Sequence, residues 1–243
     1  MRALRTLLVI AVILGGLFVA ADRIAVNLAE DEAAQRIKAR EGLVEEPEVS
    51  IKGFPFLTQV LGGSLHEVDA RMTDFTAGSG DAEVRISELD ADLRDVEFSG
   101  DFSSAKAATA TGTARIPYEE LLEAARAKGP AELRGGIKAE VVGLSDGGNG
   151  KVKVDVKIEA PIIGTRDVEV LSSVNVKGDN TVQVRADNLP SFGIDFAERQ
   201  MRQVTDISQL VDGLPGGIEL DKVTPEKNGI AVTVKGSDVQ LTG

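Results

Sequence analysis

Residues 51–63 read Ile-Lys-Gly-Phe-Pro-Phe-Leu-Thr-Gln-Val-Leu-Gly-Gly, and the rest of the chain is best interpreted around this apolar block. Phe54 and Phe56 flank Pro55, and further apolar side chains precede the glycine pair: Leu57, Val60 and Leu61. Two interpretations fit. In the first, Gly53 supplies an unusual backbone angle, Pro55 fixes a turn and both rings complete a core. In the second, a ring lines an apolar cavity or enters a membrane. Residue chemistry alone favours the first, because apolar clusters usually belong to cores.

The segment before this block has the pattern of membrane targeting. Arg2 and Arg5 precede an uncharged stretch from Thr6 to Ala21 that ends in small residues. Residues 1–21 therefore fit either a cleaved signal peptide or an uncleaved N-terminal anchor. Either one makes the remainder extracytoplasmic, exported or anchored to the outer face of the cytoplasmic membrane. Residues 22–46 are expected as a helical lead-in, because helix formers run from Asp22 to Glu41 before Gly42 and Pro47.

Residues 47–243 are expected to form a single domain rich in antiparallel strands. Apolar residues alternate along residues 84–98 and 151–159, with slips of phase in the first run that predict turns or bulges. The second run follows a predicted turn, Ser145 to Gly150. Helical spacing predicts helices over Pro117 to Lys128 and Asp195 to Asp212. Because helices do not alternate regularly with strands, the predicted class is α+β.

Composition excludes several classes of function. The formal charge of −12 disfavours nucleic acid as a partner, and the 4% of aromatic residues suits a sugar-binding enzyme poorly. No cysteine and a single histidine, His66, exclude thiol catalysis and the common zinc sites, and no cofactor or metal site is predicted.

One motif suggests catalysis. Residues 143–147 match the Gly-x-Ser-x-Gly nucleophile elbow, which requires a strand-to-helix turn and a histidine after the serine. His66 precedes Ser145, and a glycine-rich turn follows it, so a hairpin loop is the better interpretation. The sequence therefore predicts no catalytic residues and no enzyme.

Four stretches besides the N-terminal apolar segment carry a family resemblance: Ala21 to Val26, Ile51 to Gln59, Ala114 to Tyr118, and Gly213 to Val232. Through them the chain resembles the actinobacterial LmeA-like family, which is grouped by fold with the TULIP lipid-binding proteins. The resemblance implies a long, curved, mainly antiparallel sheet wrapped around one or two amphipathic helices. It also implies a groove for phospholipid acyl chains and a role in building or maintaining the cell envelope, with no assigned catalytic residues.

The resemblance shifts the interpretation of the opening block, so we expect at least one of Phe54 and Phe56 to face a lipid groove. Arg166 is a candidate cation for a phosphate head group. The predicted partner is a phospholipid or another acyl-chain lipid at the outer face of the cytoplasmic membrane. The alternative is a membrane-tethered structural or scaffold protein without a lipid cavity. The predicted lipid-binding residues are Phe54, Pro55, Phe56, Leu57, Leu61, Tyr118, Leu122, Arg166, Phe196, Met201 and Val204.

Overall fold

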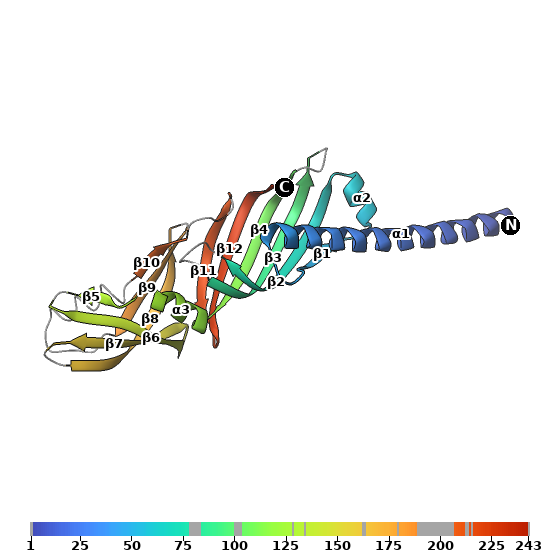
Figure 1. The fold of residues 1–243 in the computed structure, drawn as a ribbon. Helices are drawn as coiled ribbons and strands as arrows, with labels where there is room; N and C mark the ends of the chain where they lie inside the picture. The colour runs from blue at the N-terminus through green and yellow to red at the C-terminus, as the bar shows by residue number, and fades with distance from the viewer. Residues whose placement is uncertain are drawn as a thin grey trace. The chain divides into compact units, whose positions relative to one another are not determined.

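The structure is a computed structural model that describes residues 2–77, 84–99, 104–127, 129–133, 135–161, 164–178, 180–188, 207–211, 214 and 216–242. It is α+β, with a long N-terminal apolar helix and extensive antiparallel sheets, one of them strongly curled (Figure 1). This confirms the predicted class. The chain forms two compact units: unit 1 contains residues 1–72, 90–111 and 236–243, and unit 2 contains residues 73–89 and 112–235.

Strands of the described residues form two six-stranded sheets. The first has the order β1 (Glu48–Lys52), β2 (Ser64–Ala77), β3 (Val84–Phe98), β4 (Ser104–Pro117), β12 (Gly229–Thr242) and β11 (Ile218–Pro225). The second has the order β10 (Ile207–Leu210), β9 (Thr181–Asn188), β8 (Gly164–Lys177), β7 (Lys151–Ala160), β6 (Ile137–Gly148) and β5 (Ala131–Leu133). The helices are α1 (Arg2–Glu41), α2 (Phe56–Leu61) and α3 (Tyr118–Ala127).

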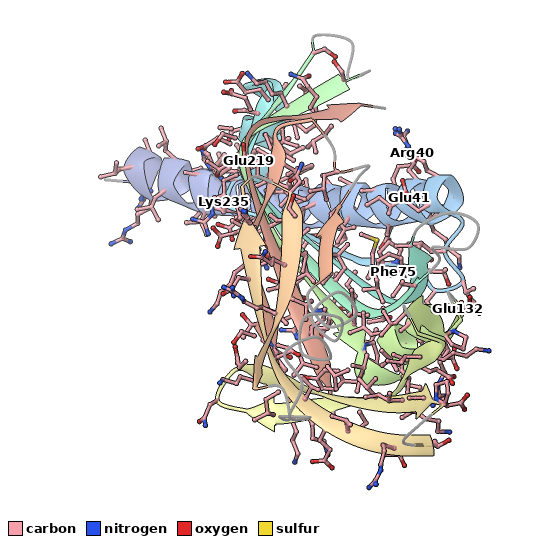
Figure 2. The ribbon with its side chains drawn as sticks, turned by 90° about the vertical axis from the view of Figure 1, so that its left-hand side faces the viewer. Arg40, Glu41, Phe75, Glu132, Glu219 and Lys235 are labelled. Atoms are coloured by element: carbon pink, nitrogen blue, oxygen red, sulfur yellow. The ribbon has the colours of Figure 1, made fainter. Side chains whose placement is uncertain are left out.

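Helix α1 is continuous from the apolar segment into the expected lead-in. It ends where the sequence predicted, because Gly42 adopts a φ of 67° and the Leu43 N–H bonds to the Lys38 carbonyl at 3.0 Å. Arg40 and Glu41 lie at this end of the helix, far from the apolar segment (Figure 2). The division at residues 21/22 and 46/47, and the single domain from residue 47, stay predictions.

Strand β3 keeps its direction across the predicted slip of phase. Arg94 and Asp95 are both exposed, and Asp95 adopts a φ of 49° between half-buried Leu93 and buried Val96. The left-handed backbone moves the apolar side chains back to the covered face, as a bulge does. One continuous strand thus replaces the several short ones that the phase changes allow.

Strand β7, which forms a hairpin with β6, shows the predicted alternation, with Val152, Val156 and Ile158 buried. The turn between them was predicted too long. Gly148 still pairs with Lys151, so the turn is only Asn149-Gly150, with φ values of 52° and 70°. Two adjacent residues at positive φ give the tight hairpin that antiparallel strands prefer.

The helix predicted over Asp195 to Asp212 is wrong at Ile207–Leu210, which is strand β10 paired with β9. Residues 189–206 lie outside the described residues. Ile207 and Leu210 fit helical spacing, but a short apolar run does not separate helix from strand. The hydrogen-bonded pairing with Thr181 to Val184 makes this segment a strand. By contrast, α3 confirms the helix predicted after Pro117.

Candidate functional site

Unit 1 contains an apolar groove of about 410 Å³ that is partly open to solvent. Its walls come from α1, β1, α2, β2, β3, β4 and β12. The lining residues are Ala29, Glu32, Ala33, Arg36, Val49, Ile51, Phe56, Val60, Leu65, Val68, Leu93, Val96, Phe98, Ala105 and Leu241. The size lies within the range of about 300–1,000 Å³ for small-molecule sites, which are mostly apolar with a few polar groups.

Helix α1 supplies a wall of small residues with charges beside it. Ala29 and Ala33 lie four residues apart, on one face of the helix, and both are half-buried. Their short side chains leave room that larger ones would fill. Glu32 and Arg36 also line the groove, and the Arg36 Nε donates to the Glu32 Oε1 at 2.8 Å. This ion pair is largely exposed, so it lies at the rim.

Helix α2 follows a backbone turn that only glycine permits. Gly53 has a φ of 94°, and a Cβ at this position would lie 2.8 Å from the Gln59 Nε2. The Phe54–Pro55 peptide bond is cis. Gln59 is buried, and its side-chain oxygen accepts from the His66 N–H at 3.0 Å. The turn therefore depends on Gly53 and Gln59 together.

A residue from α1 caps α2. Pro55 at the N-cap has no side-chain hydrogen bond to offer, and Asp22 accepts the Leu57 N–H at 2.8 Å instead. The Asp22 carboxylate is fully buried and also accepts from the Arg23 guanidinium at 2.9 Å. Desolvation raises the pKa of Asp22, but hydrogen bonds from the Leu57 and Phe56 backbone and from Arg23 outweigh it and lower the pKa below its ordinary value. Asp22, the first residue after the apolar segment, thus holds α2 in place.

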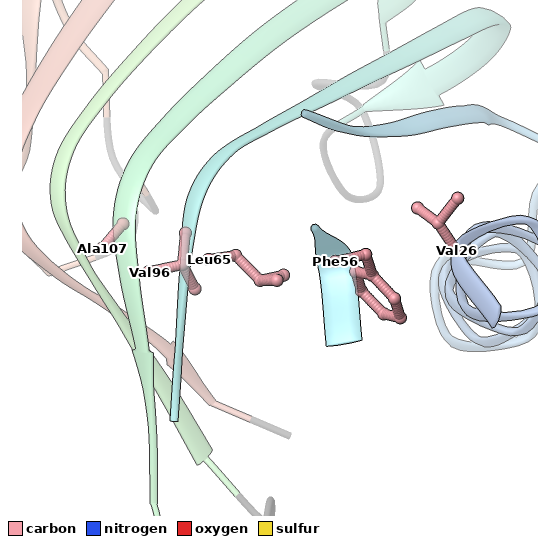
Figure 3. Packing of buried hydrophobic residues seen from close by; sticks show 5 residues of the cluster. All are labelled: Val26, Phe56, Leu65, Val96 and Ala107. Atoms are coloured by element: carbon pink, nitrogen blue, oxygen red, sulfur yellow. The ribbon is translucent and has the colours of Figure 1, made fainter. Parts of the chain in front are cut away.

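The two rings of the block have different environments. Phe56 is 6% exposed, lines the groove and packs between Val26 of α1 and Leu65 of β2 (Figure 3). Phe54 is 57% exposed, and the Arg23 guanidinium carbon lies 5.3 Å from its ring centre. The interpretation that both rings complete a core is therefore wrong for Phe54. Phe56 belongs both to the core cluster and to the groove wall.

The other predicted lipid-binding residues are dispersed. Pro55 is half-buried, Leu57 packs against the core cluster and Leu61 is 87% exposed; none of these three lines the groove. Phe196, Met201 and Val204 lie outside the described residues.

Three predicted residues belong to unit 2 and do not line the groove: Tyr118, Leu122 and Arg166. The buried Tyr118 donates its hydroxyl to the Glu226 carbonyl at 3.0 Å. Burial and the nearby Asp146 and Glu226 raise the pKa of Tyr118. Leu122 is half-buried and Arg166 exposed. A lipid contact at any of them stays a prediction.

The nucleophile-elbow motif lies within strand β6. Gly143 pairs with Asp155 and Ser145 pairs with Lys153, so the serine is on a ladder and not on a strand-to-helix turn. The predicted hairpin loop is also wrong here, because the strand continues to Gly148.

An acidic cluster on unit 1 is matched by cations. Glu67, Asp69 and Asp92 present carboxylates within 4.8 Å of one another. Arg94 bonds to Asp92 at 2.9 Å and approaches Glu67 at 3.8 Å, while Lys52 lies 3.3 Å from Asp69. The hydrogen bond and charge of Asp92 raise the pKa of Arg94. These ion pairs account for the cluster.

Most of the groove was missed by the sequence analysis, although one signal was present. Val26, Ala33 and Ile37 fall on one face of the helix predicted over residues 22–46, and this apolar face is thin. A thin face of small residues is what a groove wall requires, whereas a core-packing helix carries a wider one. Asp22 gave no local signal, because its bond to Leu57 spans 35 residues.

The sequence model of a family described as LmeA-like phospholipid-binding matches residues 20–235. The matched range starts just before Asp22 and includes every groove-lining residue except Leu241. No curated protein and no solved structure matches the chain.

Proposed function

Because the chain belongs to the LmeA-like phospholipid-binding family, we propose that it is a non-enzymatic, extracytoplasmic protein that binds or transfers phospholipid. In this proposal it is tethered to the outer face of the cytoplasmic membrane and serves to build or maintain the cell envelope. The acyl chains enter the groove of unit 1.

The groove is the observation that carries this proposal. Burying an acyl chain contributes about 0.8 kcal/mol per methylene, and a lipid that leaves a bilayer loses a similar amount. A receiving site therefore needs only to match the apolarity of the membrane. The groove does so with aliphatic and phenylalanine side chains, and its volume of about 410 Å³ admits part of a lipid.

A cation at the groove supports a phosphate-bearing ligand. Arg36 is the one arginine or lysine among the described lining residues, and its side chain is 76% exposed. Its guanidinium donates one N–H to Glu32 and carries further N–H groups that suit a phosphate oxygen. We assign the head-group contact to Arg36 in preference to Arg166, which lies in unit 2.

The tether is supported by the apolar half of α1. The helix includes an 18-residue window of mean hydropathy 2.4, and none of that window is buried. Leu4 to Val19 present large apolar side chains that are exposed by 41% or more. Outside a membrane these side chains would stay in contact with water, at a cost that a bilayer removes.

Photolabelling tests the proposal with the full chain. The protein is reconstituted into vesicles of phosphatidylethanolamine and phosphatidylglycerol that contain a phospholipid with a diazirine on its acyl chain. After irradiation, labelled peptides are mapped by mass spectrometry. We expect label both on residues 6–21 and on the groove-lining strands, including Leu93 to Phe98 of β3. Label on residues 6–21 without label in the groove would refute lipid binding there.

The same experiment separates the alternative. A structural or scaffold protein tethered by α1 would be labelled in its spanning segment alone. The apolar groove counts against that alternative, because a scaffold has no need for an open apolar surface of this size.

A further inference from the structure

Phe54 lies at the level where α1 would leave the membrane. In a bilayer the long Arg5 side chain would reach the cytoplasmic surface, so Leu4 to Ala21 would span about 27 Å at 1.5 Å per residue, close to a hydrocarbon core of about 30 Å. The hydrocarbon boundary then falls near the step from Ala21 to Asp22. The next turn, Asp22 to Ala25, covers about 6 Å, which matches the head-group layer of one leaflet.

The side chains of this turn suit that layer. Arg23 is half-exposed and lies over the Phe54 ring, and Ile24 is 61% exposed. An arginine with an exposed ring or aliphatic neighbour is the combination that bilayer interfaces favour, with the cation at the phosphates and the apolar groups below them. In water, Ile24 and the Phe54 ring would both stay more than half exposed, at 61% and 57%.

We propose that Arg23, Ile24 and Phe54 form an interfacial patch that seats unit 1 on the outer leaflet of the bilayer crossed by α1. The proposal rests on the tether in the proposed function. The patch binds the lipid head-group layer itself, because that layer belongs to the same bilayer that surrounds the preceding part of α1. The patch brings Phe54 into the interface while Phe56, two residues later, faces the groove.

The patch is connected to the groove by short contacts. Asp22 precedes Arg23 and accepts the Leu57 N–H at 2.8 Å, and α2 carries Phe56 and Val60 in the groove wall. Docking of Phe54 therefore places the α2 wall next to the leaflet. A lipid then passes from leaflet to groove without a long path through water, which exposed methylene groups disfavour.

Single-tryptophan variants test the patch, because the chain contains no tryptophan. Phe54→Trp and Ile24→Trp are made in the full chain and reconstituted into vesicles of phosphatidylcholine and phosphatidylglycerol. Val44→Trp is the matched control, since Val44 is 85% exposed and follows the far end of α1. Phe18→Trp reports on the spanning segment. Emission is recorded with lipids brominated at shallow or deep acyl positions.

We expect both patch variants to emit at shorter wavelength than Val44→Trp and to be quenched several-fold more by shallow than by deep bromines. Phe18→Trp should be quenched by deep bromines. If both patch variants emit and quench like Val44→Trp while Phe18→Trp is quenched, the patch is refuted and the tether stands. If Phe18→Trp is unquenched as well, the tether fails and the patch fails with it. The readout does not depend on lipid in the groove, so it is independent of the photolabelling result.

Discussion

Replacing Ala33 with Phe should block the groove without removing any part of the core. Ala33 is half-buried on α1 and lines the groove, so a ring at this position extends into space that is now open. An aromatic side chain covers about 150 Å² or more, which at about 25 cal/mol per Å² is equivalent to about 4 kcal/mol of lost lipid contact. If the lipid shifts to recover half of this, about 2 kcal/mol remains, or about a 30-fold weaker affinity.

The same substitution should leave stability nearly unchanged. Phenylalanine is a poorer helix former than alanine by about 0.5 kcal/mol, but the new ring gains burial against the groove wall. The free energy of unfolding should therefore change by less than about 1 kcal/mol. This distinguishes a blocked site from a damaged core, in which loss of binding follows loss of stability.

Photolabelling of the full chain in vesicles measures the effect. In Ala33→Phe the groove peptides should lose most of their label, while residues 6–21 keep theirs as an internal standard. Ala39→Phe is the matched control, because Ala39 is exposed on the same helix and does not line the groove. Unchanged groove labelling in a folded Ala33→Phe protein would refute lipid entry at this position, and equal loss in Ala39→Phe would show a non-specific effect.

Three further outcomes follow from the apolar block of residues 51–63 and from Asp22, which caps α2. Phe56→Ala should lower the free energy of unfolding by about 3–5 kcal/mol and Phe54→Ala by less than about 0.5 kcal/mol, measured by urea unfolding; equal losses would contradict their different burial. Gly53→Ala should cost about 1–3 kcal/mol in the same assay, because alanine is strained at a φ of 94° and contacts Gln59; a neutral result would contradict this turn. Because the pKa of Asp22 is lowered, its contribution to stability is complete above the unfolded value of about 3.9 and is lost as pH falls through the folded value. Acid unfolding of the native chain should therefore be steeper below that pH than unfolding of Asp22→Asn, and parallel curves would exclude the cap.

Local sequence pattern was sufficient to predict the elements whose structure depends on their own residues. Valine and isoleucine alternate with lysine and aspartate along β7, and its partners on β8 follow in unbroken register from Lys151↔Ser173 to Ala160↔Gly164. The end of α1 at Gly42 was predicted for the same reason, since glycine is the residue that enters the left-handed region without strain. In both cases the residues that define the element, the alternating ones in β7 and the terminating glycine of α1, lie close together in the sequence.

The site could not be predicted in this way because its parts are far apart in the chain. The groove brings together Ala33, Phe56, Leu93 and Leu241. No two of them fall within one stretch of about 18 residues, the length over which periodicity is judged. The helix predicted at β10 was wrong for a related reason, because pairing with β9, and not the spacing of its own residues, makes this segment a strand. Tertiary pairing overrides local preference in short apolar runs.

The two halves of α1 show what the sequence can indicate about environment even when it cannot place a site. The first half is apolar on every side, as a helix surrounded by lipid must be, and none of it is buried. The second half has a narrow face of Val26, Ala29 and Ala33, with Glu32 and Arg36 beside it. A helix that closed a solid core would need larger side chains there, since protein interiors leave few voids. The small residues are therefore consistent with a wall built to leave space, and Asp22, where the two halves meet, fixes that wall to α2.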